Sequence, residues 1–254
     1  MAIDVNADLG EGFGVWQLGD DLGLLPHLSS ANVACGFHAG DPVIMQRVCV
    51  AAADAGVSIG AQVGYRDLIG FGRRRIDVSP SDLTAEIIYQ TGALQAFATS
   101  AGSRVRYLKP HGALYNTAAV DPVQAAAIVD AAVLLGGELP LLGLPNSELA
   151  RAARQRGVRF IAEAFADRGY LGNGQLVPRG TAGAVIDDEA EVVRRGVRIA
   201  TEQLVTAVDG TEIEVNADSL CLHGDTSGAV SLAEALRAGL EAAGVEVTSF
   251  AVAR

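Results

Sequence analysis

Short apolar runs alternate with longer, helix-periodic segments along this chain, and the alternation limits the folds open to it. The expected strands are 3–9, a run ending near Cys35, 57–63, 105–108, 139–144, 158–162, 219–222 and 245–250. The expected helices are 41–54, 79–102, 121–135, 146–157, 187–208 and 229–243. Because strands and helices alternate without a linker or a low-complexity tract, we predict one parallel α/β domain over residues 1–254.

Seven or eight units of roughly thirty residues favour a closed or nearly closed barrel over an open doubly wound sheet. Polar residues end six of the expected strands, and they are Asp8, His38, Gln62, Lys109, Glu163 and His223. A ring readily brings so many strand ends to one mouth, where parallel barrels place their active sites. The sequence therefore predicts a β/α barrel with a polar site at the carboxyl ends of its strands.

The segment 31–42 shows this arrangement most clearly. Its apolar run, 33–35, is followed by two glycines that bracket His38, and Asp41-Pro42 then opens an apolar-periodic segment. Aspartate is a favoured N-cap residue, and proline fits the first helical position. We therefore expect a buried strand, a tight turn that presents His38, and a helix that Asp41 caps unless it binds a ligand.

Charge and cysteine content limit the partners and the compartment. The 254 residues carry a formal net charge of −11, which argues against nucleic acid and an anionic membrane surface. The three cysteines are widely spaced without a C-x-x-C pair, which suits a reducing compartment and buried thiols. No secretory signal is visible, and the most apolar stretch, 125–135, is too short to span a bilayer. We expect a cytoplasmic protein.

Lys109 is the only lysine, beside eighteen arginines. Because arginine fills the other cation positions, this lysine is either a chance survivor or a residue whose task arginine cannot perform. A compact point charge and a tunable pKa are two such tasks. Lys109 is therefore a candidate catalytic residue.

Three of the four histidines lie in glycine-flanked turns at expected strand ends, namely His38, His111 and His223. The fourth, His27, follows a proline in a loop, and we expect it to be structural. We predict that the first three share a pocket.

Acidic residues near the same strand ends permit several roles. Asp8 and Glu11 could each serve as a general base, a metal ligand or a turn former. Glu163 ends a buried strand, where an unpaired carboxylate is costly, so it needs a partner or a task. Asp225, two residues after His223, is a further candidate.

Several known sequence motifs for nucleotide binding and catalysis are absent. The lysine is followed by a proline, which excludes a Walker A loop, and neither G-x-S-x-G nor H-E-x-x-H occurs. Gly10, Gly12 and Gly14 lack the spacing of a dinucleotide-binding fingerprint. The neighbours Asp167 and Arg168 are interpreted as a local ion pair.

Six segments stand in the order Asn6-Ala-Asp-Leu-Gly-Glu11, Ala34-Cys-Gly-Phe-His-Ala-Gly-Asp41, Lys109-Pro-His-Gly112 with Leu114-Tyr-Asn116, Phe165-Ala-Asp-Arg-Gly-Tyr170, Leu176-Val-Pro-Arg179 and Cys221-Leu-His-Gly-Asp225. Together they resemble the LamB/YcsF family over essentially the whole chain. The resemblance implies a TIM-like, seven-stranded parallel β/α barrel related to the glycoside hydrolase/deacetylase superfamily. It also implies that the 5-oxoproline lactam is opened to L-glutamate with ATP hydrolysis, together with the 5-oxoprolinase subunits B and C. ATP with Mg²⁺ would be the co-substrate, with no tightly bound metal.

The residues and the resemblance together predict two sets of site residues. The catalytic set is Asp8, His38, Lys109, His111, Glu163 and Asp225. The set that binds substrate or phosphate is Asn6, Glu11, Asn32, Asp41, Gln62, Tyr115, Arg168, Arg179 and His223. In this interpretation Lys109 stabilises phosphate or oxyanion charge, and Asp8, Glu163 or a histidine activates water.

Gln62 departs from the histidine that the family often carries in a Gly-Ala-His-Pro turn. A neutral amide is a poor ligand for a transition metal, so a metal held by Asp8 and His38 is disfavoured. Two alternatives stay open. One is a metal-dependent deacetylase or carbohydrate hydrolase that acts alone, and the other is a non-catalytic subunit that binds a small acid.

Overall fold

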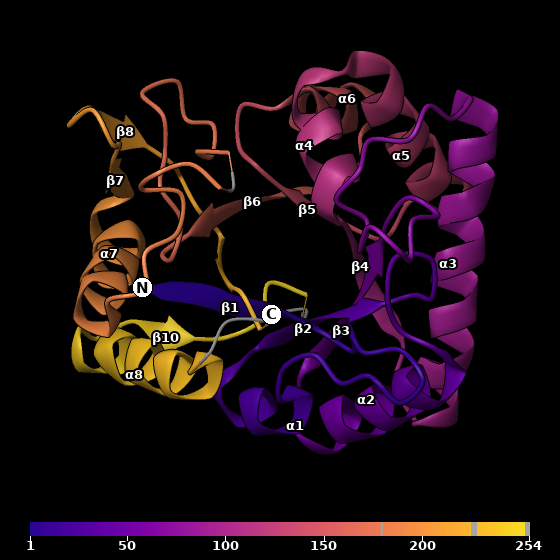
Figure 1. Ribbon diagram of the computed structural model, residues 1–254, viewed down its shortest axis with the longest axis horizontal. Coiled ribbons are helices and arrows are strands. Elements are labelled where there is room, and N and C mark those ends of the chain that lie inside the picture. Colours follow the sequence, from indigo (N-terminus) through magenta and orange to yellow (C-terminus); the bar gives the residue numbers. More distant parts are fainter. Residues whose placement is uncertain (179, 225–227, 252–254) are drawn as a thin grey trace.

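Seven parallel strands close into a barrel in the computed structural model, which describes residues 1–178, 180–224 and 228–251 (Figure 1). The barrel strands are β1 (Ala2–Leu9), β2 (Ser30–Ala34), β3 (Ser58–Val63), β4 (Val105–Pro110), β5 (Leu141–Gly143), β6 (Phe160–Phe165) and β9 (Ser219–Leu222). Each strand pairs with the next, and β9 pairs with both β6 and β1, which closes the ring. The predicted seven-stranded β/α barrel is confirmed.

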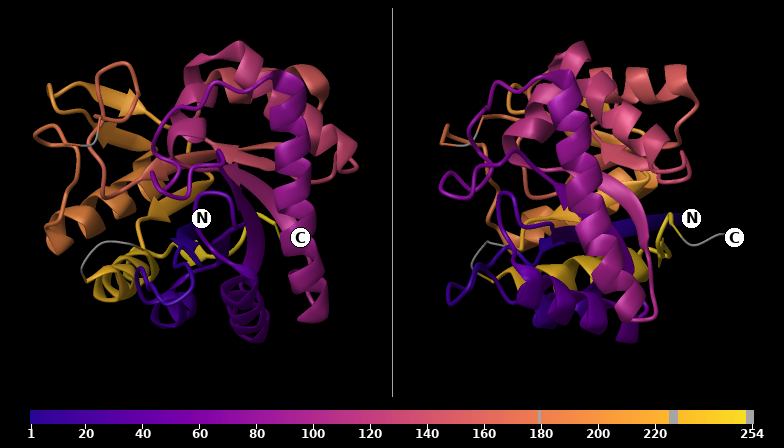
Figure 2. Two further views of the ribbon diagram at one scale, coloured as in Figure 1. Left: turned by 45° about the vertical axis from the view of Figure 1, so that its right-hand side comes forward. Right: turned by 90° about the vertical axis from the view of Figure 1, so that its right-hand side faces the viewer.

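Helices surround the barrel, and Figure 2 shows the longest of them, α3, running along one side. They are α2 (Pro42–Asp54), α3 (Pro80–Ser100), α5 (Pro122–Leu134), α6 (Glu148–Arg156), α7 (Glu189–Glu202) and α8 (Ala229–Ala242). Five of these helices begin after a side-chain oxygen that accepts a main-chain N–H, from Asp41, Ser79, Asp121, Ser147 and Asp188. These capping residues are where the sequence predicts the helices to start.

Several short elements carry too weak a pattern to be predicted. They are α1 (Asp21–Leu24), the 3-10 helix η1 (Leu25–His27), α4 (Gly112–Val120) and the hairpin of β7 (Leu204–Thr206) and β8 (Glu212–Glu214). The helix expected to reach residue 208 ends at Glu202, because Gln203 adopts a left-handed φ of 60° and the chain turns into β7. β6 runs to Phe165, so Glu163 lies within a strand instead of at its end.

Aromatic packing closes the floor of the barrel at the amino ends of the strands. The last strand is shorter than expected: β10 (Glu246–Val247) pairs with the start of β1, and Phe250 packs edge-on against Tyr107, with ring centroids 5.0 Å apart. Gly60 on β3 makes room for Tyr107, since a Cβ there would come within 2.1 Å of the tyrosine ring.

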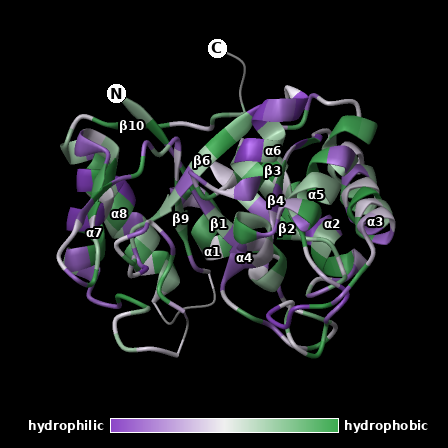
Figure 3. Cartoon of the chain, turned by 90° about the horizontal axis from the view of Figure 1, so that it is seen from above, coloured by the Kyte–Doolittle hydropathy of each residue, from purple (hydrophilic) through white to green (hydrophobic). Residues whose placement is uncertain are grey.

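The helices turn their apolar residues toward the strands, and Figure 3 shows hydrophobic and hydrophilic residues interleaved along α3 and α7. The most apolar helix, α5, buries Ala125, Ile128 and Val129 against its neighbours. Among the described residues, no single helix is long and apolar enough to cross a membrane. α4 and α5 would reach that length and apolar content only if counted as one segment, and the two helices are bent by 112° relative to each other.

Candidate active site

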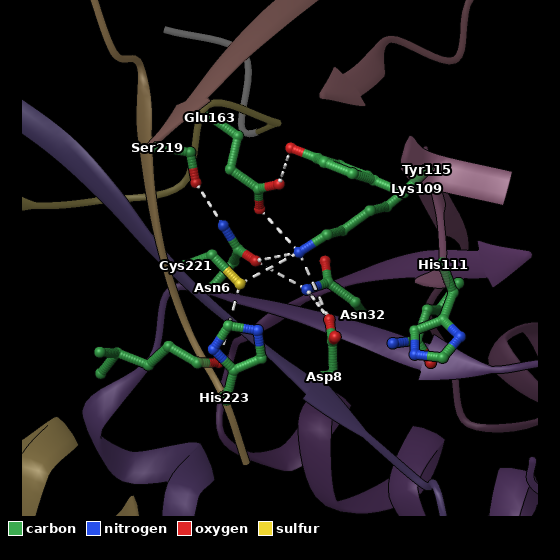
Figure 4. Close-up of polar contacts among 12 residues, drawn as sticks. Asn6, Asp8, Asn32, Lys109, His111, Tyr115, Glu163, Ser219, Cys221 and His223 are labelled. Atoms are coloured by element: carbon green, nitrogen blue, oxygen red, sulfur yellow. Dashed lines mark hydrogen bonds and ion pairs between the residues drawn. The ribbon is translucent and has the colours of Figure 1, made fainter. Parts of the chain in front are cut away.

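A buried lysine lies at the centre of the barrel, where side chains from several strands converge (Figure 4). Lys109, on β4, places Nζ 2.7 Å from Oε1 of Glu163 and 3.3 Å from Oδ1 of Asp8. The same ammonium group donates to Oδ1 of Asn6 at 3.1 Å and to Sγ of Cys221 at 3.1 Å. We call these five residues the lysine cluster. Its single cation is shared by two carboxylates from different strands.

Strand geometry explains why residues distant in sequence meet in this cluster. Side chains two positions apart face the same side of a strand. β1 therefore turns both Asn6 and Asp8 toward Lys109, and β9 turns both Ser219 and Cys221 inward. The contact between Cys221 and Lys109 is not predicted from the sequence. Its only signal is the alternation of Ser219, Cys221 and His223 with two leucines.

Two asparagine amides connect the cluster to its surroundings. Nδ2 of Asn32 donates to Oδ1 of Asn6 at 2.7 Å and to Oδ1 of Asp8 at 2.9 Å. The hydroxyl of Tyr107 donates to Oδ1 of Asn32 at 2.7 Å, and Nδ2 of Asn6 donates to Oγ of Ser219 at 2.7 Å. Each amide thus has one accepting and one donating end, and its orientation is set by its partners.

The cluster holds its charges despite burial. Burial favours the neutral lysine, but the carboxylates of Asp8 and Glu163 outweigh it and hold the pKa of Lys109 well above its ordinary value. Burial likewise raises the pKa of Asp8, but Lys109 and His223 more than compensate and keep it below its ordinary value. Burial raises the pKa of the Cys221 thiol well above its ordinary value. At pH 7, Lys109 is therefore an ammonium, Asp8 a carboxylate and Cys221 a neutral thiol.

Tyr115 binds the second oxygen of Glu163. Its hydroxyl, on α4, donates to Oε2 of Glu163 at 2.9 Å. Burial and the nearby carboxylate raise the pKa of Tyr115 well above its ordinary value, so the phenol is protonated. Both oxygens of Glu163 are thus engaged, one by Lys109 and one by Tyr115.

A histidine and a carboxylate form a pair beside the lysine cluster. His223 directly follows β9, and its Nδ1 lies 2.7 Å from Oδ2 of Asp167, which follows β6. The main-chain N–H of His223 donates to the same oxygen at 3.2 Å. Burial raises the pKa of Asp167, but the adjacent histidine outweighs it and holds that pKa below its ordinary value. A carboxylate only accepts, so whenever the ring of His223 is neutral its proton lies on Nδ1 and Nε2 keeps a lone pair.

A second buried group, the histidine cluster, consists of Glu11, His38, Gln62 and His111. Nε2 of Gln62 donates to Oε1 of Glu11 at 3.0 Å, and Oε1 of Gln62 lies 3.1 Å from Nε2 of His38. Nε2 of His111 is 3.5 Å from Oε1 of Glu11, and the two imidazole rings stack with centroids 4.1 Å apart. Burial lowers the pKa of His38 to about 4 and that of His111 well below its ordinary value. Both histidines are therefore neutral at pH 7.

Three members of the histidine cluster offer possible metal ligands, because atoms of Glu11, His38 and His111 lie within 4.8 Å of one another. A metal ion lies in the plane of each imidazole that binds it, along the nitrogen lone pair. Here the ring planes differ by only 17° and are stacked, so one ion cannot lie in both planes. Nε2 of His38 also needs its proton to donate to Gln62. As arranged, these residues do not fit a shared metal ion.

A cavity of about 490 Å³ lies above the lysine cluster at the mouth of the barrel. Its lining includes charged and polar side chains of Asp8, Arg73, Lys109, His111, Tyr115 and His223. Residues 175–178, in the loop after β6, form one wall. Arg168 anchors this loop, since Nη2 donates to the carbonyl of Val177 at 2.7 Å and Nε to that of Ala184 at 2.8 Å. A cavity of this volume suits a small organic ligand.

Other residues expected at the site lie elsewhere. Asp41 accepts hydrogen bonds from the main-chain N–H groups of Val43 and Ile44 at the start of α2 and joins neither cluster. Arg179 and Asp225 fall outside the described residues. Cys35 and Cys49 are buried and unpaired, as expected of packing residues.

Comparisons with known proteins agree with the fold. The profile of the LamB/YcsF family matches residues 3–254. A protein of Streptomyces griseus, named as the A subunit of 5-oxoprolinase, is 59% identical over 249 residues, which cover 98% of this chain and 100% of that one. A protein of Mycobacterium marinum with the same name is 56% identical and covers 98% of each chain. The crystal structure of a lactam utilization protein from Thermus thermophilus superposes with a TM-score of 0.94 at 44% identity, covering 98% of this chain and 100% of that one.

Proposed function

The chain belongs to the LamB/YcsF family, and on that premise we propose that it acts as the A subunit of an ATP-dependent 5-oxoprolinase. The observation that carries the proposal is the buried ammonium of Lys109 at the base of a cavity sized for a small ligand. Relatives 53–59% identical over 98% of the chain bear the matching name. The substrate would be 5-oxoproline, the co-substrate ATP with Mg²⁺, the partners subunits B and C, and the compartment the cytoplasm.

The lactam of 5-oxoproline is a stable amide, and ATP would activate it by phosphorylating its oxygen. Water then adds to the carbonyl carbon, the ring nitrogen leaves with a proton, and the resulting acyl phosphate is hydrolysed by a second water to glutamate and phosphate. Negative charge builds on the phosphorylated oxygen when phosphate leaves in the second hydrolysis. The ammonium of Lys109 would stabilise that charge, because it is fixed beforehand in a water-poor site.

His223 is the group best placed to activate the water. Both oxygens of Glu163 are engaged, and the pKa of Asp8 is held low by Lys109, which makes it a weak base. His223 borders the cavity and is oriented by Asp167, and its neutral ring offers a lone pair on Nε2. We assign it to remove the proton from water and to return it to the ring nitrogen.

Reconstitution tests the activity. Glutamate release and ATP hydrolysis that depend on 5-oxoproline would be measured with this chain alone and with candidate subunits B and C. We expect glutamate only from the full mixture. An absence of glutamate from a mixture whose subunits are folded and associated would refute the proposal.

Substitution of His223 tests the base. We expect His223→Ala to lower kcat by about 10²- to 10⁴-fold, the usual contribution of a positioned acid-base group. Asp167→Asn should lower kcat less, because it disturbs orientation but leaves the imidazole. His27→Ala, in η1 and outside the site, is the matched control and should leave kcat unchanged. Equal kcat for His223→Ala and His27→Ala would show that His223 is not the base.

A further inference from the structure

A buried carboxylate without a counter-ion lies one layer below the lysine cluster. Asp4 is on β1, and among the described residues it forms no ion pair. Instead it accepts hydrogen bonds from three hydroxyls: Ser29 at 2.7 Å and Ser30 at 2.6 Å on Oδ1, and Ser219 on Oδ2. Such burial is costly, which raises the pKa of Asp4 to about 6 and still leaves it ionised at pH 7. The reaction proposed above makes no use of this carboxylate.

Hydrogen bonds connect Asp4 to the lysine through two residues. Ser219 donates its single proton to Asp4, so its oxygen is free to accept from Nδ2 of Asn6 at 2.7 Å. Once Nδ2 of Asn6 faces the serine, Oδ1 must face the other way, where it accepts from Nζ of Lys109 at 3.1 Å and from Nδ2 of Asn32 at 2.7 Å. Figure 4 shows Asn6 between Ser219 and Lys109 in this orientation.

The two ends of this series of hydrogen bonds determine the direction of every bond between them. A carboxylate can only accept and an ammonium can only donate. If the proton of Ser219 pointed at Asn6 instead, the amide would turn over and present its NH₂ group to the ammonium, donor against donor. We propose that Asp4 is a positioning residue for Lys109: through Ser219 it holds the Asn6 amide with its oxygen toward the lysine.

The spacing along β1 supports this arrangement. Residues 4, 6 and 8 lie on one face of the strand, so that Asp4, Asn6 and Asp8 form successive layers from the floor toward the mouth. Asp8 contacts the lysine directly, Asn6 contacts it as an acceptor, and Asp4 acts only through Ser219. The polar residues of β1 thus form one unit organised around Lys109.

The part of this inference that concerns catalysis rests on the proposed lactam hydrolysis, whereas the part that concerns Lys109 does not. Because Lys109 is the only lysine, protein labelled on lysine side chains gives one Nζ and one Cε signal by NMR. These signals report the environment of Lys109 whatever the reaction is. They therefore separate a failure of the positioning role from a failure of the proposed function.

The experiment compares Ser219→Ala with Ser30→Ala. Each variant removes one hydroxyl from Asp4, but only the hydroxyl of Ser219 also accepts a hydrogen bond from the Asn6 side chain. We expect Ser219→Ala to shift the Lys109 signals and to lower kcat about 10- to 100-fold with little change in KM, the effect of a displaced catalytic group. Ser30→Ala should leave the signals and kcat near the wild-type values.

Asn6→Asp supplies the second arm. A carboxylate accepts at both ends, so in that background the orientation of residue 6 no longer depends on its neighbours. We expect Ser219→Ala and Asp4→Ala to shift the Lys109 signals in the wild-type background but not in the Asn6→Asp background. Unchanged signals in Ser219→Ala, or equal shifts in both backgrounds, would overturn the positioning role. If Asp4→Ala does not fold, the Ser219→Ala pair decides the question alone.

Discussion

The lysine cluster and the histidine cluster are buried in the same barrel, and burial favours the neutral form of the side chains in both, yet only the lysine cluster keeps its charges. In the lysine cluster, Asp8 and Glu163 lie within 3.3 Å of Lys109, and the charges persist because each has an opposite charge in contact. In the histidine cluster, burial removes the charge from both imidazoles, and Nδ1 of His38 and of His111 has no hydrogen-bond partner among the described residues. Of these two clusters, only the one in which a counter-charge is in contact keeps its charges.

The largest test of this difference is Lys109→Met. Removing the cation leaves two acidic side chains buried without their partner, so we expect the free energy of unfolding to fall by about 3–5 kcal/mol. With the proposed charge stabilisation lost, kcat should fall by about 10²- to 10³-fold or more. Urea unfolding and the reconstituted assay measure the two effects.

Arg237→Met provides the matched comparison for Lys109→Met. It breaks the ion pair between Arg237 and Glu241 on α8, which lies at the surface, and should change the free energy of unfolding by less than about 1 kcal/mol. A similar small loss in Lys109→Met would show that the carboxylates need no buried cation.

His38→Gln should have a smaller, pH-dependent effect on the free energy of unfolding. In the wild type, the unfolded chain protonates His38 near pH 6.5 while the folded protein does not until about pH 4. Stability from this residue is therefore present above pH 6.5 and is lost as the pH falls toward 4. Glutamine does not titrate. As the pH falls over that range, the free energy of unfolding should therefore decrease by up to about 3 kcal/mol less in the variant than in the wild type.

Asp4 has the opposite effect on the pH dependence of stability, over an overlapping pH range. Its pKa in the folded protein, about 6, lies above its ordinary value of 3.8. Its contribution falls as the pH rises from about 4 to 6. Because Asp4 is the same in both proteins, the difference between their pH profiles isolates His38. Parallel profiles for the wild type and His38→Gln would show that the folded protein binds the proton as readily as the unfolded chain.

The smallest effect is expected of Cys221→Ser. The thiol is neutral and contributes no charge to the lysine cluster, and a serine hydroxyl still accepts from Lys109. We expect a change of about 1 kcal/mol in the free energy of unfolding and less than a tenfold change in kcat. A loss of kcat as large as that of Lys109→Met would assign the sulfur a chemical role.

The sequence predicts the barrel and part of the site because both depend on local patterns. Apolar periodicity and capping residues mark the elements, and a polar residue at a strand end is expected at the mouth of a parallel barrel. Asp8, Lys109 and His223 converge on the cavity in this way. The sole lysine among eighteen arginines is a further local signal.

The partners across the barrel could not be predicted, because they depend on which strands meet when the ring closes. Asp167 is expected to pair with its sequence neighbour Arg168, but it bonds His223 from the adjacent strand while Arg168 holds main-chain carbonyls. Cys221, Ser219 and Tyr107 look like ordinary strand residues. They contact Lys109, Asn6 and Asn32 only because β4 and β9 point these side chains into the barrel.

The closure of the ring by β9 has a consequence for synthesis. The hydrogen bond between Asn6 and Ser219 joins residues 213 positions apart, so β1 leaves the ribosome long before its partner exists. Until then β1 and β6 each have an open edge, and open edges pair readily with other chains. The last barrel strand to be made thus completes the lysine cluster and removes both open edges in one step. A chain that stops before residue 219 would be inactive and prone to aggregate for the same reason.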